Sequence, residues 1–271
     1  MSSSRPRVSV LMPIWNTRHD YVFEAVESLA RQTIRDWELV VVEDPSEQNA
    51  RELIRTFADP RIRYVGNESR TSLVSQLNRG LDLCQAAYVA RLDADDRCQP
   101  QRLEQQLAYL DGHAKCGVVG CQLEIIDEAG DVVAQRPYPV GAARIVQTMR
   151  LRNAIAHPGA MFRKSLVESL GGYRDAFPYA EDYDLWSRVH KAGVELHNVP
   201  ETLLQYRVHN GQIKSQKLRA QIAGTIGVKR AYWKDSMGPK GRLRLAGEQV
   251  LMAFPPRLIT RLFRFLYHNN H

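Results

Sequence analysis

The sequence of 271 residues lacks any apolar run approaching the ~20 residues that a helix needs to cross a bilayer. Its start, MSSSRPRVSV, has no hydrophobic signal region. We therefore expect a cytoplasmic protein. Cysteine is also scarce: Cys84, Cys98, Cys116 and Cys121 form no C-x-x-C pair. This spacing argues against zinc ligation and favours buried thiols in a reducing compartment.

Glycine is missing from a place where two enzyme classes need it. The segment MPIWNTRHD (12–20), which follows the first apolar run, contains none. A nicotinamide-dependent oxidoreductase would carry G-x-G-x-x-G there. A nucleotidyltransferase would usually carry a glycine-rich basic loop that grips a triphosphate. Both classes are therefore disfavoured.

The charge is unevenly distributed. The chain carries +7 overall, but residues 210–271 hold 12 Lys and Arg against 2 acids, and the first 209 residues are net negative. Such a basic extension suits an anionic partner, either a membrane or a nucleic acid. No nucleic-acid recognition module accompanies it, so we expect no nucleic-acid partner.

Apolar strands and amphipathic helices alternate in the first half. We expect strands at 8–14, 38–44, 61–65 and 87–93, with helices near 22–29, 46–58 and 74–84 between them. This rhythm predicts an α/β fold with a mostly parallel, Rossmann-like sheet flanked by helices. Further helix and strand signals follow at 102–110 and 116–126, and 210–271 reads as a helical extension.

Polar side chains follow three of these strands, and parallel strands place them on one ligand-binding edge. They offer a ring, an amide and carboxylates that suit a nucleotide: Pro13, Trp15 and Asn16; Glu43 and Asp44; Asp93, Asp95 and Asp96. Three carboxylates this close would repel one another, and Mg²⁺ or Mn²⁺ would bridge them to a diphosphate. The alternative is a solvated acidic loop or a cap for the next helix.

Six segments in register resemble bacterial glycosyltransferase family 2: VSVLMPIWN, VVVEDPS, NRGLDLCQAAYVARLDADD, HPGAMFR, GGYRDAFPYAEDYDLWSRV and LLQYRVHNGQIKSQ. The resemblance covers residues from about 7 to 216. It implies a GT-A fold, a nucleotide-sugar donor (most often UDP-linked), Mn²⁺ or Mg²⁺, and inversion at the anomeric carbon. We expect a catalytic domain over 1–209, with donor binding in 1–98 and the acceptor side and base in 99–209, and an extension over 210–271.

The resemblance also assigns roles to residues near the donor. The segment Pro13–Asn16 (with Trp15) and Asp44 beside Glu43 would hold the base and ribose. Asp93 would face the ribose and Asp95 the metal, with Asp96 as a second candidate ligand. Pro45 departs from the glycine of many relatives. Arg70 is a candidate phosphate contact.

Further roles fall in the second half. By the family match, Asp182 of the Glu181–Asp182 pair is the general base; the alternative is that these acids only cap a helix, as we expect of Asp184. Arg207 and His209 alternate along a strand or its exit, so they share a face. By resemblance His209 would complete the metal shell and Arg207 would meet the phosphates; otherwise they are ordinary satisfied side chains.

Two residues concern the acceptor. His157 either lines the acceptor side or shapes the loop before Pro158, and Trp186 is either core or a platform for a sugar. The segment 255–271 reads as a basic amphipathic helix that lies in a membrane interface, packs on the domain or joins an oligomer.

Together these features predict a metal-dependent inverting glycosyltransferase of the hexosyl- or N-acetylhexosaminyl type. Its acceptor would be a glycan or lipid-linked hydroxyl in surface polysaccharide or glycolipid synthesis, reached through peripheral contact with the membrane. The alternatives are a nucleotidyltransferase or a non-catalytic nucleotide-sugar-binding protein.

Overall fold

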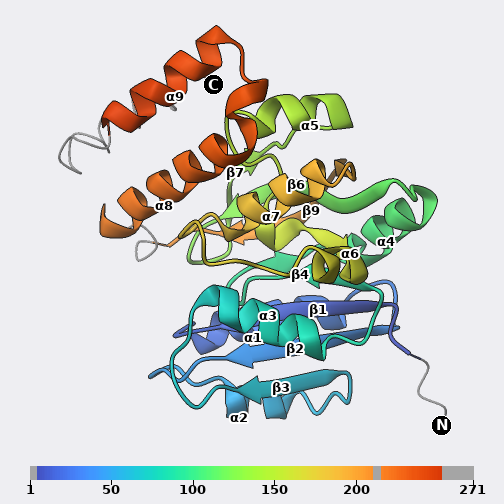
Figure 1. The fold of residues 1–271 in the computed structure, drawn as a ribbon. Helices are drawn as coiled ribbons and strands as arrows, with labels where there is room; N and C mark the ends of the chain where they lie inside the picture. Colours follow the sequence, from blue (N-terminus) through green and yellow to red (C-terminus); the bar gives the residue numbers. More distant parts are fainter. Residues whose placement is uncertain (1–4, 210–214, 252–271) are drawn as a thin grey trace.

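The computed structural model describes residues 5–209 and 215–251, and its centre is one curled sheet (Figure 1). In spatial order the strands of this described sheet are β3 (Ile62–Gly66), β2 (Trp37–Glu43), β1 (Val8–Ile14), β4 (Tyr88–Arg91), β8 (Met161–Arg163), β6 (Cys116–Ile126), β9 (Glu195–Arg207) and β5 (Arg97–Cys98), and β7 (Val132–Arg136) pairs with β6.

The sheet has two different halves. Strands β3, β2, β1 and β4 are all parallel, as the alternation of strands and helices predicted. Beyond β4 the pairing is mixed, because β8 runs antiparallel to both β4 and β6, whereas β6 and β9 are parallel. The α/β class is confirmed, and the parallel, Rossmann-like part is confined to the first half.

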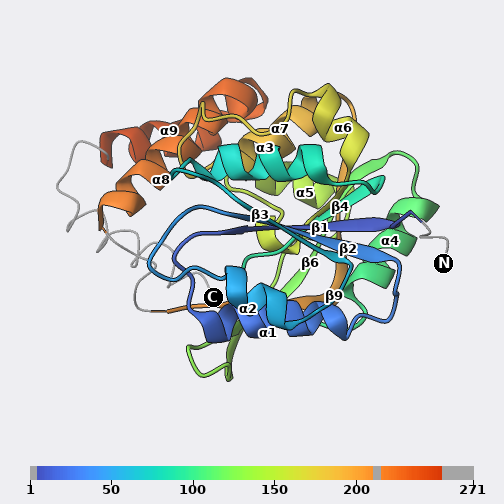
Figure 2. The same ribbon diagram turned by 90° about the horizontal axis from the view of Figure 1, so that it is seen from below.

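Helices cover both faces of the sheet (Figure 2). One face carries α1 (His19–Ala30), α2 (Arg51–Thr56) and α4 (Arg102–Gly112); the other carries α3 (Leu73–Leu83), α6 (Lys164–Ser169) and α7 (Glu181–Lys191). The strands are apolar on both sides because each side is buried. Leu11 of β1 belongs to the hydrophobic cluster under α3 and α7, and its neighbours Val10 and Met12 to the cluster under α1 and α4.

Helix α2 starts later than the sequence suggested. It begins at Arg51, and its first free backbone N–H, that of Ala50, donates to Oε1 of Glu43 at 2.8 Å. Ser46, where the sequence placed the start of this helix, instead accepts from the backbone N–H of Asn16 at 3.2 Å. A carboxylate from the end of β2 therefore replaces the local cap, because it satisfies an N–H that the helix itself cannot.

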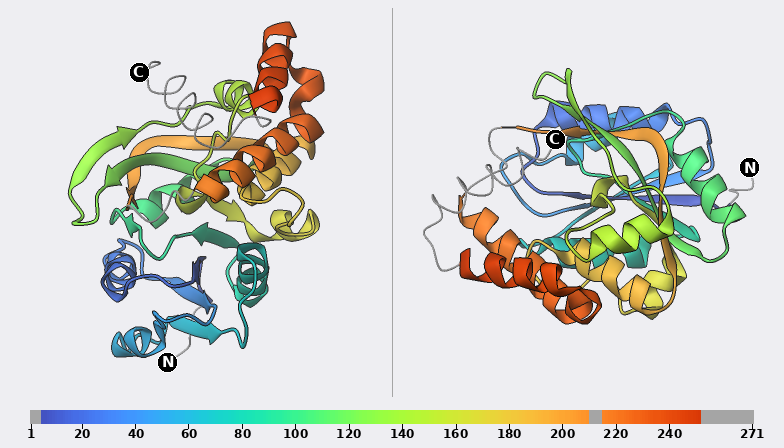
Figure 3. Two further views of the ribbon diagram at one scale, coloured as in Figure 1. Left: turned by 90° about the vertical axis from the view of Figure 1, so that its left-hand side faces the viewer. Right: turned by 90° about the horizontal axis from the view of Figure 1, so that it is seen from above.

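The described part of the C-terminal extension packs on the domain. It comes after β9 in the chain and consists of α8 (Ser215–Val228), the π-helical turn η2 (Lys229–Trp233), η3 (Lys234–Ser236) and α9 (Pro239–Leu251). Two further elements of the domain are α5 (Ala142–Met149) and the short turn η1 (His157–Gly159). Figure 3 shows α8 and α9 at the end of the molecule opposite α2 and β3. The indole N–H of Trp233 donates to Ser187 of α7 at 2.8 Å, and Ile222 and Ile226 share a hydrophobic cluster with Trp186.

These contacts change how the extension is understood. Ile222, Ile226 and Trp233 of the extension expected from residue 210 belong to a hydrophobic cluster of the catalytic domain, whereas Leu243 and Val250 of α9 are exposed. The amphipathic segment 255–271 lies outside the described residues. Within the described ranges, none of the helices combines the length and the apolar character that a membrane crossing requires.

Candidate functional site

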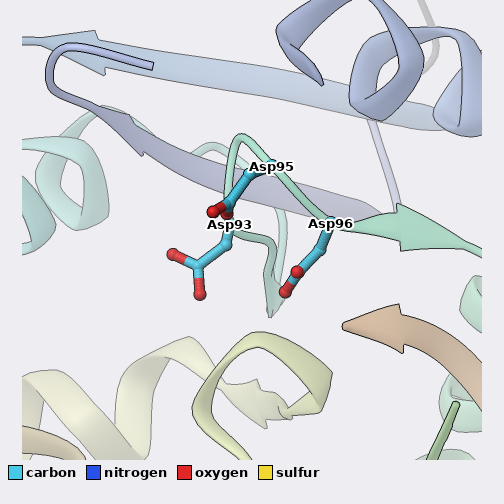
Figure 4. A group of neighbouring side chains, drawn as sticks. All are labelled: Asp93, Asp95 and Asp96. Atoms are coloured by element: carbon cyan, nitrogen blue, oxygen red, sulfur yellow. The ribbon is translucent and has the colours of Figure 1, made fainter. Parts of the chain in front are cut away.

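Three carboxylates gather in the turn between β4 and β5 (Figure 4). Asp93, Asp95 and Asp96 project from this turn to a common side, and one oxygen of each lies within 4.8 Å of the others. Nε2 of His209, just after β9, is 3.4 Å from Oδ2 of Asp95. The structure thus brings together all the residues that the sequence offered as metal ligands.

The acidic turn is electrostatically incomplete. Asp96 is 1% exposed, and its Oδ2 accepts no hydrogen bond from residues 5–209 or 215–251. Burial and the neighbouring Asp93 and Asp95 raise the pKa of Asp96 well above its usual value, and burial and Asp93 raise that of Asp95. Oxygen ligands at this spacing, with one orphaned and buried, fit a hard divalent cation, which would favour the ionised forms.

Two buried arginines hold the turn in place. Nη1 of Arg91 lies 2.5 Å from Oδ1 of Asp93. Arg207 is 1% exposed; its backbone N–H donates to Oδ1 of Asp96 at 2.9 Å, and its side chain donates to the carbonyl of Asp95 at 3.0 Å and to Glu24. The expectation that Arg207 meets the donor phosphates is therefore wrong for this structure, because its guanidinium is enclosed and occupied.

The ends of β1 and β2 present one accessible ring. Trp15 is 40% exposed, and the guanidinium carbon of Arg70 lies 3.6 Å from its ring centroid, so Arg70 covers the ring. Asn16 adopts a left-handed backbone conformation (φ 53°), which turns the chain after β1, and Pro13 is buried in β1. This edge could hold a nucleobase against Trp15.

The two acids at the end of β2, Glu43 and Asp44, are buried, and both accept hydrogen bonds from the protein. Asp44 accepts from Asn67 at 2.5 Å and from the backbone N–H of Thr71 at 2.7 Å. Glu43 accepts from Ala50 and, at 2.6 Å, from the hydroxyl of Tyr64. Glu43, at 1% exposure, thus anchors α2 and β3, which corrects its expected contact with the donor.

The acidic turn opens into a cavity of about 690 Å³. Asp93 and Arg91 line one part of it, and Glu181 and Asp182, the first residues of α7, line another. Asp184 is not in its wall: it is buried against Arg188, at 2.8 Å, and Tyr232, so it stabilises the fold. The cavity therefore joins the candidate metal site to the candidate base.

Asp182, the candidate base, has one hydrogen-bond donor on each carboxylate oxygen. Its Oδ1 accepts from the backbone N–H of Tyr183 at 2.7 Å, and its Oδ2 accepts from Nδ2 of Asn153, also at 2.7 Å. Burial, and then the charge of Glu181, raise the pKa of Asp182 to about 7, whereas an ordinary aspartate titrates near 4. A carboxylate with this pKa can accept a proton and release it again near neutral pH.

The two residues expected on the acceptor side differ in position: His157 lines the cavity, and Trp186 is buried. His157 lines the cavity, its Nε2 lies 3.0 Å from the hydroxyl of Tyr173, and burial and Arg91 lower its pKa well below the usual range, so the ring is neutral. Trp186 is fully buried, with its ring edge-on to His157. It therefore belongs to the core, the first of the two positions that the sequence allowed, and its enclosed ring does not support the predicted place on the acceptor side.

Several residues that line the cavity escaped the sequence reasoning. They are Arg136, Tyr138, Arg152 and Asn153, together with Gln221, Ile222, Thr225, Ile226, Lys229 and Glu248 from the C-terminal helices. The spacing of Ile222 and Ile226, four residues apart on a helix, could have indicated a buried face, but not what that face covers. The other lining residues lie far from the acidic motifs in the sequence, so no local pattern connected them to the site.

Comparisons with known proteins agree with this geometry. The family model described as "Glycosyl transferase family 2" matches residues 9–171. The putative glycosyltransferase EpsE of Bacillus subtilis is 31% identical over 96% of this chain and 94% of its own, and the amylovoran biosynthesis glycosyltransferase AmsE of Erwinia amylovora is 32% identical over 77% and 79%.

Solved structures support the fold. Residues 1–349 of S. aureus TarS with UDP superpose with a TM-score of 0.61 at 17% identity, covering 86% of this chain and 73% of that one. The mannosyltransferase PcManGT of Pyrobaculum calidifontis, with GDP-Man and Mn²⁺, gives 0.66 at 17% identity, covering 94% and 72%. The fold is thus GT-A, and this chain belongs to glycosyl transferase family 2.

Proposed function

We propose that this glycosyltransferase moves a hexose or N-acetylhexosamine from a nucleotide diphosphate sugar to a hydroxyl group with inversion of the anomeric carbon. The observation that carries the proposal is the single cavity lined by Asp93 and Asp182. A diphosphate held near the acidic turn would leave from one side of the sugar, and a hydroxyl activated by Asp182 would attack from the other. UDP is the proposed nucleotide, in keeping with the UDP complex of TarS.

The acidic turn fits a divalent cation, and the proposed ligands are Asp95, Asp96 and His209, with Asp93 nearby. When bound, Mn²⁺ or Mg²⁺ would stabilise the charge of the departing diphosphate. Trp15 and Arg70 would cover the base, and Asp44 would contact the base or the ribose. His157 and the walls from α8 and α9 would face the acceptor.

The proposed acceptor is a glycan or lipid-linked hydroxyl in surface polysaccharide or O-antigen synthesis. This rests on relatives named for amylovoran and O-antigen biosynthesis, including WbnJ of Escherichia coli, which is 31% identical over 78% of this chain. A peripheral membrane contact is supported by α9, whose Leu243 is 75% exposed between exposed Arg242 and Arg244. Deletion of residues 255–271 should reduce flotation with anionic liposomes, and unchanged flotation would refute a role for that segment.

Two substitutions separate binding from chemistry. Asp95→Asn should abolish Mn²⁺-dependent binding of UDP in calorimetry, because one ligand oxygen is lost. Asp182→Asn should leave that binding near normal and lower turnover by roughly 10²–10⁴-fold, because it removes the base. Turnover is measured as release of UDP from a panel of UDP-sugars. Equal loss of UDP binding in both variants would show that the two roles are not divided in this way.

A further inference from the structure

Among the described residues, Asn153 is the one whose side-chain amide donates a hydrogen bond to the proposed base. It lies in the loop between α5 and η1, 29 positions before Asp182, and both side chains line the cavity. Its Nδ2 donates to Oδ2 of Asp182 at 2.7 Å. Its own Oδ1 accepts from the backbone N–H of Ile155 at 3.2 Å.

These two contacts fix the orientation of the amide. If the Asn153 amide were reversed, its NH₂ group would face the N–H of Ile155 and its oxygen would face the carboxylate of Asp182. Both contacts would then be repulsive. The backbone at Ile155 therefore ensures that Asn153 always presents a donor to Asp182.

The donor in turn restricts the carboxylate. Oδ1 of Asp182 is held by the backbone N–H of Tyr183, at the start of α7, and Oδ2 is held by Asn153. With one donor on each oxygen, the carboxylate has a defined plane. Each oxygen keeps further lone pairs for a substrate. A hydrogen bond to the charged form also favours that form, which opposes the effect of burial and of Glu181.

We propose that Asn153 is a positioning residue for the general base: it fixes the plane of the Asp182 carboxylate and stabilises its ionised form. The inference rests on the proposed role of Asp182. In the transfer, the acceptor O–H bond breaks and its proton passes to an oxygen of Asp182. The acceptor oxygen bonds to the anomeric carbon, and the bond from that carbon to the diphosphate breaks, with its electron pair leaving on the nucleotide. Asn153 neither gains nor loses a proton.

The first test needs no substrate. The titration of the Asp182 carboxyl carbon is followed by NMR in protein labelled with ¹³C-aspartate, and the signal is assigned by its loss in Asp182→Asn. In Asn153→Ala the midpoint should rise by about one pH unit or more, because a hydrogen bond to a charged group is removed. Asn153→Asp, which has the same shape, should raise it further, because a second carboxylate would face the first.

The second test is catalytic and uses the hydrolysis of whichever UDP-sugar the panel identifies. With a midpoint near 7 raised by one unit, Asn153→Ala should lose about five-fold in rate at pH 7 and recover most of this loss by pH 9. The matched control is Asn78→Ala. Asn78 also makes two hydrogen bonds, both to the backbone of Tyr173 at 2.9 and 3.0 Å, and neither involves Asp182. The Asn78→Ala substitution should lower the melting temperature and leave the dependence of the rate on pH unchanged.

The outcomes are separable. An unchanged midpoint for Asp182 in Asn153→Ala, or a rate loss that is the same at every pH, would overturn the positioning role. So would an equal shift of the midpoint in Asn78→Ala. If no UDP-sugar were hydrolysed by the wild-type protein, the proposed function would fail on its own, and the NMR titration would still decide whether Asn153 controls the ionisation of Asp182.

Discussion

Acidic residues occur in both halves of the molecule, but their surroundings differ. In the parallel half, Glu43 ends β2 and Asp44 follows it, and each is surrounded by protein donors and almost fully buried. In the second half, Asp182 begins α7 beside a cavity, with one backbone and one amide donor. The same side-chain chemistry thus anchors the fold in one place and is left available for reaction in the other. The number of protein partners separates the two cases better than residue type does.

The acidic turn lies between these extremes. Asp96 is as buried as Glu43, but one of its oxygens has no hydrogen-bond partner in the described chain. Burial without full pairing is costly, and this cost is what a ligand can offset. The comparison therefore predicts which acids matter for stability and which for binding.

The largest effect that we expect on stability is at Glu43. Glu43→Ala removes the acceptor for the N–H of Ala50 and for the hydroxyl of Tyr64, so the free energy of unfolding should fall by roughly 2–4 kcal/mol. Urea unfolding measures this change. Glu43→Gln keeps one acceptor oxygen and should cost less. If Glu43→Ala unfolds like the wild type but loses affinity for UDP, the acid contacts the donor after all.

The acidic turn should respond to pH and metal together. The raised pKa values of Asp95 and Asp96 mean that folding favours their protonated forms. Without metal, their contribution to stability is therefore greatest near or below the usual pKa of about 4 and falls as pH rises through the raised values. Mn²⁺ competes with these protons, so it should raise the melting temperature more at pH 7.5 than at pH 5.

Differential scanning fluorimetry with and without Mn²⁺ measures this dependence. Asp95→Asn serves as the control and should show little change with metal at either pH. A shift of the melting temperature that is the same at both pH values would argue that Mn²⁺ binds elsewhere.

The smallest effect on the free energy of unfolding should come from substitution of Trp15, whereas substitution of Glu43 should have the largest. Its ring is partly exposed and covered by Arg70, so Trp15→Ala should barely change unfolding. If the ring stacks on the nucleobase, affinity for UDP should fall by roughly five- to tenfold, the lower end of stacking energies of about 1–3 kcal/mol. Calorimetry with UDP and Mn²⁺ gives the result, and Trp15→Phe should retain most of the affinity. Unchanged affinity in Trp15→Ala would remove the ring from the donor site.

The amino-acid sequence by itself determined the alternating strands and helices of the first half, the acidic turn and the family. These features are local: a buried parallel strand is apolar throughout, and Asp93, Asp95 and Asp96 are neighbours in the chain. Nε2 of His209 lies 3.4 Å from Oδ2 of Asp95, and the role of His209 as a metal ligand stays a prediction.

Only the tertiary structure decided which polar groups are already satisfied. Arg207 meets Asp96 across 111 positions, Glu43 meets Tyr64 across 21, and Asn153 meets Asp182 across 29. It also placed residues of α8 and α9 in the lining of the cavity, a position that the sequence did not predict for the basic extension. Hydrogen bonding and burial depend on the neighbours that folding brings together, and no local pattern of residues records them.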